Sequence, residues 1–253
     1  CLRDRGKVME SEMIEVRSPG TGVEPYRKKE IIGKIATRNF KKNDFFFQSD
    51  IDSNLAIEPH SYKFNRPWGV PVRYHDVDNL INKASPDLVE FHLSYKDLEL
   101  NPKNYLLRDY NIDLVVHVPE LFANDHILDL SSENQSYREI SIKNLQKTID
   151  VTRSIREFFP KCIKDIPLVL NVGGATLNEP VAYELKNKMY NRILESLSKV
   201  NSDGVEIIPQ TMPPLPWHFG GQRFHNLFMD SEDIIEFCKK NNSRICLDIS
   251  HAK

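Results

Sequence analysis

Side chains that can move protons recur beside short apolar segments of this chain. Glu90 and His92 lie in the sequence VEFHLS, and His117 lies in VVHVPE. Near the C-terminus, Asp248 and His251 lie three residues apart in LDISHA. Carboxylates and imidazoles are the groups that bind a divalent cation or transfer protons beside a sugar carbonyl. We therefore predict these five residues as the catalytic residues.

Two amides and one aromatic loop extend this set. Asn171 in VLNVGG and Gln210 in IIPQTM follow two further apolar segments. The loop 209–222 places three prolines just before Trp217 and His218. A tryptophan can stack on a sugar face and a histidine can hydrogen-bond a hydroxyl group; the alternative is a rigid loop that buries its aromatic for packing. We predict these four residues as substrate-binding residues.

From about residue 70 onward, strands that alternate with amphipathic helices are expected to position these side chains. The strand-like segments are at 70–74, 88–93, 114–118, 167–172, 205–208 and 245–249. The helical segments are at 77–84, about 135–159, 180–200 and 231–241. Strands that are apolar on both faces indicate a parallel sheet covered by helices. Because no GxGxxG or Walker loop follows a strand, the pattern favours a (β/α)₈ TIM barrel over a doubly wound sheet.

The barrel prediction has consequences for the site. Strand ends on one side of a barrel converge on a single mouth, and residues two apart on a strand share a face. His75 in VRYHD either joins that mouth or lies in a surface turn. The chain begins with Cys1 and stops two residues after His251. We therefore expect an incomplete barrel of about six of eight strands, taken from a longer protein.

The N-terminal part has a different pattern. Short apolar pieces broken by turn sequences such as SPGTG and KKND occur at 13–17, 31–35 and 45–47. This texture predicts a small β-rich module over residues 1–52. Prolines and a glycine in 53–69 predict a linker, and 70–253 is the predicted barrel.

Composition excludes several classes of protein. The 253 residues are 40% hydrophobic and 28% charged, and the net charge is −2. No global basic field favours nucleic acid or an anionic membrane as partner, and no apolar run approaches the roughly 18 residues of a membrane span. Four cysteines without CxxC spacing indicate reduced thiols and a cytoplasmic location.

Three segments of the N-terminal module resemble the SAF, or antifreeze-like, domain of sialic acid synthases. They are EVRSPGTGVEP (15–25), IIGKIATRNF (31–40) and KKNDFFFQSDI (41–51). The resemblance implies a homodimer in which an arginine before the PG turn reaches the partner's amino-sugar substrate. Arg17 is the matching residue, with Ser18 between it and Pro19. The resemblance further implies that a synthase barrel, which condenses phosphoenolpyruvate with an N-acylated hexosamine, precedes this chain.

Residues 70–253 resemble the xylose isomerase-like barrels, a superfamily of sugar-phosphate isomerases, epimerases and AP endonucleases. The matching segments are HVPELF (117–122), VLNVGG and CLDISHA (246–252). The resemblance implies site roles for Asp248 and His251. Asn171 stands where the superfamily has a histidine, and Gln210 stands in place of its metal-binding glutamate. Because amides bind divalent cations poorly, the expectation is a metal-free sugar site or a single ion.

The predicted ligands of such an ion, which would be Mn²⁺, Mg²⁺ or Zn²⁺, are His117, Asp248 and His251. The predicted function is sugar isomerisation or epimerisation in the biosynthesis of sialic acids for surface polysaccharides, with Glu90 or His92 as base. The substrate would be an amino sugar or a sugar phosphate. A barrel that only binds sugar or serves as a scaffold is the alternative. DNA repair of the endonuclease IV type is disfavoured by the net charge and by the missing glutamate.

Overall fold

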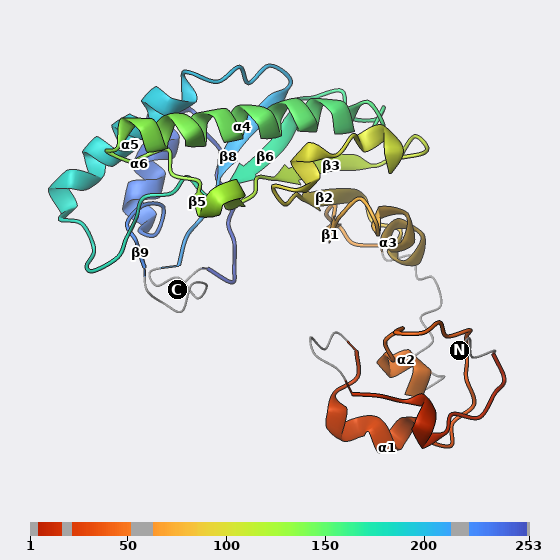
Figure 1. Cartoon of the computed structure of the whole chain (residues 1–253). Helices are drawn as coiled ribbons and strands as arrows, with labels where there is room; N and C mark the ends of the chain where they lie inside the picture. The colour runs from red at the N-terminus through yellow and green to blue at the C-terminus, as the bar shows by residue number, and fades with distance from the viewer. Residues whose placement is uncertain (1–4, 17–21, 52–62, 214–222, 252–253) are drawn as a thin grey trace. The chain divides into compact units, whose positions relative to one another are not determined.

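The chain divides into two compact units, Cys1–Ser61 and Tyr62–Lys253. A computed structural model describes residues 5–16, 22–51, 63–213 and 223–251. Figure 1 shows the helices and strands of each unit, coloured along the chain. The candidate site lies in the second unit.

The second unit is built on a parallel sheet. Its five strands are β1 (Gly69–Val72), β2 (Leu88–His92), β3 (Asp113–His117), β6 (Ile166–Leu170) and β8 (Val205–Pro209). They lie in the order β1-β2-β3-β6-β8, so each neighbour in the sheet is also the next of these strands along the chain. A doubly wound sheet reverses its order at a switch point, whereas a TIM barrel does not. The fold is therefore α/β and TIM-barrel-like, as predicted.

The predicted sixth strand, 245–249, was too long. In the described residues it forms a single parallel bridge beside the end of β8. Cys246 N donates to Pro209 O at 2.8 Å, and Thr211 N donates to Cys246 O at 3.0 Å. Beyond this point Asp248 N donates to the hydroxyl of Thr211 at 2.9 Å, so a side chain replaces the backbone ladder. The segment continues the strand order without forming a regular strand.

Helices cover the sheet. They form in the segments whose apolar residues recur about every 3.6 residues. They are α3 (Val77–Ala84), α4 (Gln135–Arg156), α5 (Tyr183–Leu197) and α6 (Ser231–Asn241). In α4, Ile142, Leu145 and Ile149 recur every three or four residues and are buried. This stripe packs against β6 and β8, and Figure 1 shows α4 lying across the sheet. Full burial of each such side chain contributes about 1.5–3 kcal/mol. The bounds of α3 and α6 confirm the predicted helices.

Helix α5 begins three residues later than predicted. Ala182 directly precedes its first residue. The carbonyl of Glu179, which lies before the helix, accepts the hydroxyl of Thr176 at 2.6 Å. Val181 N donates to Asn226 Oδ1 at 2.9 Å. These contacts form a turn beside two short paired strands, β7 (Ala175–Thr176) and β9 (Phe224–His225).

Two further short strands, β4 (Leu121–Phe122) and β5 (His126–Ile127), pair antiparallel after β3. The 3₁₀ turns of this unit are η4 (Asp97–Glu99), η5 (Pro102–Asn104) and η6 (Ala123–Asp125). The first two connect β2 to β3 in place of an α-helix.

The first unit differs from the predicted β-rich module. Its described elements are η1 (Ser11–Met13), η2 (Pro25–Arg27), α1 (Lys28–Ile31) and α2 (Gln48–Ile51). Pairing between two described residues is limited there to one antiparallel bridge, Val8 with Ile35, and Phe40 is a further bridge residue. The small core of this unit contains Met9, Ile14, Ile31, Ala36, Phe40 and Ile51. Of the predicted strand pieces, only Ile14 and Ile31 enter this core, and both lie at helical turns, η1 and α1, rather than in strands.

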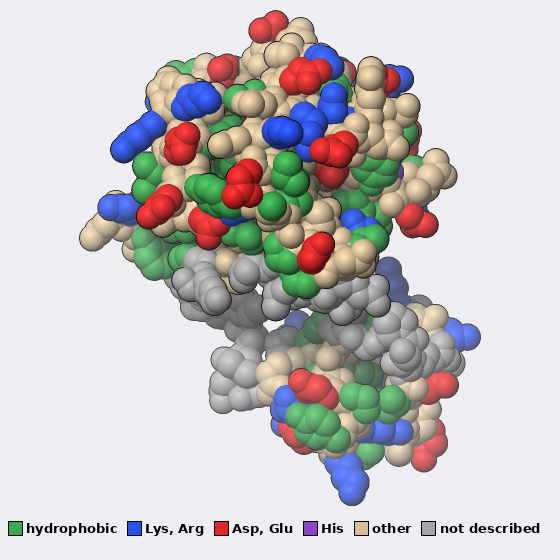
Figure 2. Space-filling view, turned by 90° about the vertical axis from the view of Figure 1, so that its left-hand side faces the viewer, with side chains coloured by type: hydrophobic (Ala, Val, Ile, Leu, Met, Phe, Trp, Pro, Cys, Tyr) green, Lys and Arg blue, Asp and Glu red, His purple; other side chains and the backbone are tan. Residues whose placement is uncertain are grey.

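Charged side chains of both signs are interspersed over the face of the second unit shown in Figure 2. This distribution agrees with the net charge of −2. Cys162, Cys238 and Cys246 are free thiols, as predicted. Within the described ranges, each helix is too short or too polar to cross a membrane.

Candidate functional site

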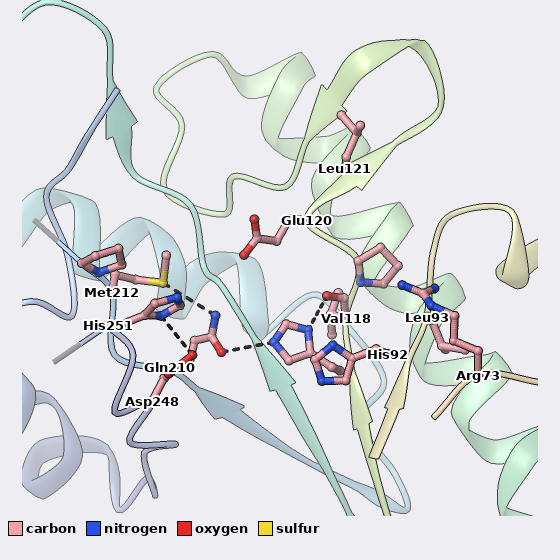
Figure 3. Close-up of a pocket in the computed structure, with 13 residues that line it drawn as sticks. Arg73, His92, Leu93, Val118, Glu120, Leu121, Gln210, Met212, Asp248 and His251 are labelled. Carbon is pink, nitrogen blue, oxygen red and sulfur yellow. Dashed lines mark hydrogen bonds and ion pairs between the residues drawn. The ribbon is translucent and has the colours of Figure 1, made fainter. Parts of the chain in front are cut away.

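A cavity of about 400 Å³ opens at the carboxyl-terminal edge of the sheet (Figure 3). Its walls come from the ends of β1, β2, β3 and β8 and from the segment that bridges to β8. The lining residues are Arg73, His92, Leu93, His117, Val118, Pro119, Glu120, Leu121, Gln210, Met212, Pro213, Asp248 and His251. Five predicted site residues are thus brought together at one mouth, namely His92, His117, Gln210, Asp248 and His251. Their roles remain predictions.

Strand β2 supplies an ion pair at the cavity wall. Val89 and Phe91 point into the core and are fully buried, so Glu90 and His92 lie on the opposite face. His92 Nε2 lies 2.9 Å from Glu90 Oε1. Burial raises the pKa of Glu90, but the hydrogen bond from His92 and the charges of His92 and His117 outweigh it, and the net pKa is lowered. Glu90 is therefore held as a carboxylate that orients the imidazole of His92.

Strand β3 places a second imidazole beside the first. His92 and His117 are paired in register across β2 and β3. Their rings stack with centroids 4.7 Å apart and an interplanar angle of 23°. His117 Nδ1 donates to the carbonyl of Val118 at 2.9 Å. The other nitrogen, Nε2, lies 3.1 Å from Gln210 Oε1. Both ring nitrogens of His117 therefore face oxygen atoms of the protein.

The amide of Gln210 is a buried member of the site. Its residue is 4% exposed, and its Nε2 is directed at the sulfur of Met212 at 3.8 Å. Gln210 directly follows β8, as the sequence predicted. Because Gln210 Oε1 contacts His117 Nε2, the amide limits what that ring nitrogen can bind.

Thr211 ties the last segment of the site to β8. His251 Nδ1 donates to the carbonyl of Thr211 at 2.9 Å and lies 3.3 Å from Asp248 Oδ2. Asp248 Oδ1 accepts Ser250 N at 2.9 Å and Ser250 Oγ at 2.6 Å. Burial raises the pKa of Asp248, but these hydrogen bonds and the charge of His251 outweigh it and lower the pKa. Asp248 therefore remains an acceptor for a ligand.

The end of β6 does not join the cavity. The side-chain oxygen of Asn171 accepts Gly173 N at 2.9 Å and so closes a local turn. Glycine amides that follow a strand can bind an anion, but Gly174 N donates to Asp129 Oδ1 at 3.1 Å. A carboxylate of the protein itself therefore occupies the place that a phosphate would take. Asn171 lies outside the cavity lining.

Other predicted residues have no described place at the cavity. Arg17, Trp217 and His218 lie outside the described residues. His75 is exposed and lies 3.7 Å from Asp76, which is the surface-turn alternative. Glu90 does not line the cavity and acts on it only through His92.

Sequence reasoning missed the other lining residues, among them Arg73, Glu120 and Met212. Arg73 directly follows β1, and Glu120 lies three residues after His117. The rule that strand ends carry the site applies to Arg73 and could have identified it. Met212 follows the predicted Gln210 and carries no polar signal that would mark it.

The residues present do not fit the predicted metal ion. Among the described residues, no group of three or more His, Cys, Asp or Glu side chains is arranged to hold a metal. His117 presents one nitrogen to a carbonyl and the other to Gln210. His251 uses Nδ1 to donate to Thr211. The three predicted ligands, His117, Asp248 and His251, thus all make hydrogen bonds within the protein.

Solved structures of similar fold include a D-tagatose 3-epimerase-like protein, which is 20% identical (TM-score 0.47, covering 72% of this chain and 65% of that one). Endonuclease IV from Thermus thermophilus is 13% identical (TM-score 0.45, 74% and 64%). A D-allulose 3-epimerase from Methylomonas sp., in complex with D-allulose, is 15% identical (TM-score 0.49, 76% and 66%). The chain thus spans slightly less than two thirds of the length of each. No curated protein matches it.

A family model decides the relationship. The model of the xylose isomerase-like TIM barrel matches residues 79–253, which is more than half of the chain. The match includes β2, β3, β6 and β8 and the bridged segment that carries Asp248 and His251. The chain belongs to the xylose isomerase-like TIM barrel family.

Proposed function

We propose that the cavity binds a sugar and that the second unit is an isomerase or epimerase that moves a proton beside the sugar carbonyl. One observation carries this proposal: the Glu90–His92 pair, stacked against His117, at the wall of a cavity of about 400 Å³. Cavities of this size are typical of sites for small ligands. Membership of the xylose isomerase-like family is consistent with it.

His92 is the proposed base. Its Nε2 faces the carboxylate of Glu90, and its Nδ1 makes no hydrogen bond to another described residue. A carboxylate that accepts one N–H of an imidazole leaves the other nitrogen as the atom with a lone pair. The pair therefore has the arrangement of an oriented general base.

The proposed reaction conserves atoms and electrons. His92 takes the proton from the carbon next to the carbonyl, and the electron pair of that C–H bond forms a C=C bond. The carbonyl π pair moves to oxygen, which gains a proton and yields an enediol. Return of a proton to the former carbonyl carbon, with loss of the hydroxyl proton on the neighbouring carbon as its C=O bond forms, gives the isomer. Return of a proton to the opposite face of the original carbon, with loss of the proton that the carbonyl oxygen had gained, gives the epimer. His117, Asp248 and His251 would orient the hydroxyl groups.

Exchange with solvent tests this proposal. The protein in D₂O would be mixed with D-fructose, D-fructose 6-phosphate or N-acetyl-D-mannosamine, and loss of the C–H signal followed by proton NMR. We expect His92→Gln to lower the exchange rate about 10²- to 10⁴-fold, the usual contribution of a general base. His75→Gln, in an exposed histidine outside the cavity, is the matched control. Equal exchange by the wild type and His92→Gln would remove His92 from the chemistry.

A barrel that binds sugar without turning it over is the second candidate. Gln210 favours it, because the amide covers His117 Nε2 where the superfamily resemblance implies a metal-binding glutamate. Sugar binding without any exchange in D₂O would support this candidate. DNA repair has less support, because one arginine is the sole Lys or Arg of the described lining.

A second part of the proposal concerns the first unit. We propose that it is a SAF module, that Arg17 contributes to binding an amino sugar, and that the chain acts in sialic acid biosynthesis in the cytoplasm. The resemblance of residues 15–51 supports this proposal. It requires a homodimer, so sedimentation equilibrium should give twice the chain mass of 29.4 kDa. A monomer at all concentrations would contradict this part alone.

A further inference from the structure

One cation stands at the edge of the described cavity. Arg73 directly follows β1 and is the only Lys or Arg among the described lining residues. Figure 3 shows Arg73 at one end of the row of lining side chains, with His92 between it and Asp248 and His251. The cavity therefore has a guanidinium at one end and the carboxylate of Asp248 at the other, and Glu120 adds a second carboxylate to its lining.

The position of Arg73 is fixed by its surroundings. Arg73 Nη1 lies 3.2 Å from Asp97 Oδ2. The same oxygen accepts Ser94 N at 2.7 Å and Ser94 Oγ at 2.8 Å. At the backbone, Arg73 N donates to Asp76 Oδ1 at 2.7 Å. Asp97 is thus held by Ser94 and in turn orients the guanidinium at the cavity.

Most of the guanidinium is left for a ligand. A guanidinium has five N–H donors in a planar fork, and the single contact with Asp97 is its one side-chain hydrogen bond to a described residue. The side chain of Arg73 is 44% exposed, whereas that of Asp97 is 18% exposed. A planar fork with free donors matches the two oxygens of a phosphate or a carboxylate.

We propose that Arg73 makes this cavity selective for sugars that carry an oxyanion, which is a phosphate or a carboxylate group. The inference rests on the proposed function, because it names the substrate class of the same site. The oxyanion binds at Arg73, away from the like charge of Asp248. The uncharged part of the sugar then lies against His92 and His117, and its hydroxyl groups face Asp248 and His251.

Three probes and one matched control test the inference. Isothermal titration of the full chain would compare D-fructose, D-fructose 6-phosphate and D-glucuronate. We expect at least one anionic probe to bind about tenfold or more tightly than D-fructose, as a charge-assisted bidentate contact provides. Arg73→Gln should remove that preference and leave D-fructose binding unchanged. Arg108→Gln makes the same charge change at an exposed arginine paired with Asp78 outside the cavity, and should keep the preference.

The outcomes separate this inference from the proposed function. Equal binding of all three probes by the wild type overturns the role of Arg73 and leaves sugar binding intact. An equal loss for all three probes in Arg73→Gln overturns it too, because Arg73 would then only support the fold. Binding of no probe overturns both proposals. If one anion alone is preferred, the inference holds and that anion, phosphate or carboxylate, is identified.

Discussion

The ends of β2 and β6 carry similar residue types but differ in what those residues contact. At β2 and the neighbouring β3, His92 and His117 line the cavity and stack on each other. At the end of β6, Asn171 and Gly174 are both hydrogen-bonded within the protein. His92 keeps Nδ1 without a hydrogen bond to another described residue, whereas Asn171 Oδ1 and Gly174 N are both used within the protein. We expect chemistry at β2 and β3 and a structural role at β6.

The largest expected effect is a loss of stability on substitution of a glycine just after β6. Gly173 has φ of +89°, and an added Cβ would lie 2.4 Å from Asp129 Cα. Because that neighbour is backbone, no side-chain rotation relieves the clash. Gly173→Ala should lower the free energy of unfolding by about 3 kcal/mol or more, from left-handed strain plus displaced backbone. Urea unfolding monitored by circular dichroism measures this loss.

Gly204→Ala is the matched control in the same unit. Gly204 also has a positive φ, of +77°, but its added Cβ meets only the end of the Arg156 side chain at 3.1 Å. A flexible side chain can move, so the loss should stay near the roughly 1–2 kcal/mol of the left-handed strain. Equal losses of unfolding free energy for the two variants would mean that the close packing at Gly173 does not contribute to stability.

A smaller effect concerns the pKa of Glu90 at β2. Burial raises that pKa, while the hydrogen bond and charge of His92 help to bring it below the ordinary glutamate value of about 4.3. His92→Gln removes the charge and leaves the burial, so the Glu90 pKa should rise. ¹³C NMR of the side-chain carboxyl during a pH titration reads it directly. The His75→Gln control should leave the pKa of Glu90 unchanged. An unchanged Glu90 pKa in His92→Gln would contradict the pairing of Glu90 with His92.

The pairing has a consequence for stability. A carboxyl whose folded pKa is lowered stabilises the fold above its ordinary pKa, and this stability is lost as the pH falls through the folded pKa. In wild-type protein the contribution of Glu90 is therefore lost below about pH 4.3. In His92→Gln this contribution should disappear or change sign.

The smallest effect concerns Asp129, which closes the end of β6. Burial raises its pKa and outweighs the hydrogen bonds from Ser131 and Gly174. A carboxyl with a raised folded pKa stabilises the fold below its ordinary pKa of about 3.9, and that stability is lost as the pH rises through the folded pKa. Asp129→Asn does not titrate and keeps Oδ1 as acceptor. Its unfolding free energy relative to wild type should therefore increase with pH above about 4. A difference that does not vary with pH would contradict the buried carboxylate.

The sequence predicted the sheet and its helices well because their signals are local. Apolar segments of four to six residues and a 3.6-residue stripe such as that of α4 depend only on near neighbours. The same reasoning failed in the first unit, where Ile14 and Ile31 enter a small core from helical turns rather than from strands. Short apolar pieces do not distinguish these two outcomes.

The site was predicted in part for the same reason. That Glu90 and His92 share a face follows from the two-residue period of a strand. The contact of Gly174 could not be read in this way, because its partner Asp129 lies 45 residues away in the sequence. Arg73 was missed because its contact with Asp97 joins two loops that no local pattern links. Contacts between distant segments therefore determine which side chains at the strand ends can bind a ligand.

The most direct test of the difference between β2 and β6 is an NMR titration of the full chain with D-fructose 6-phosphate. This probe offers a sugar to the imidazoles and a phosphate to the glycine amides. We predict that the ring signals of His92 and His117 shift on binding while the amide signals of Gly173 and Gly174 stay in place. Shifted glycine amides with unmoved imidazoles would place the site at β6 and contradict the central claim.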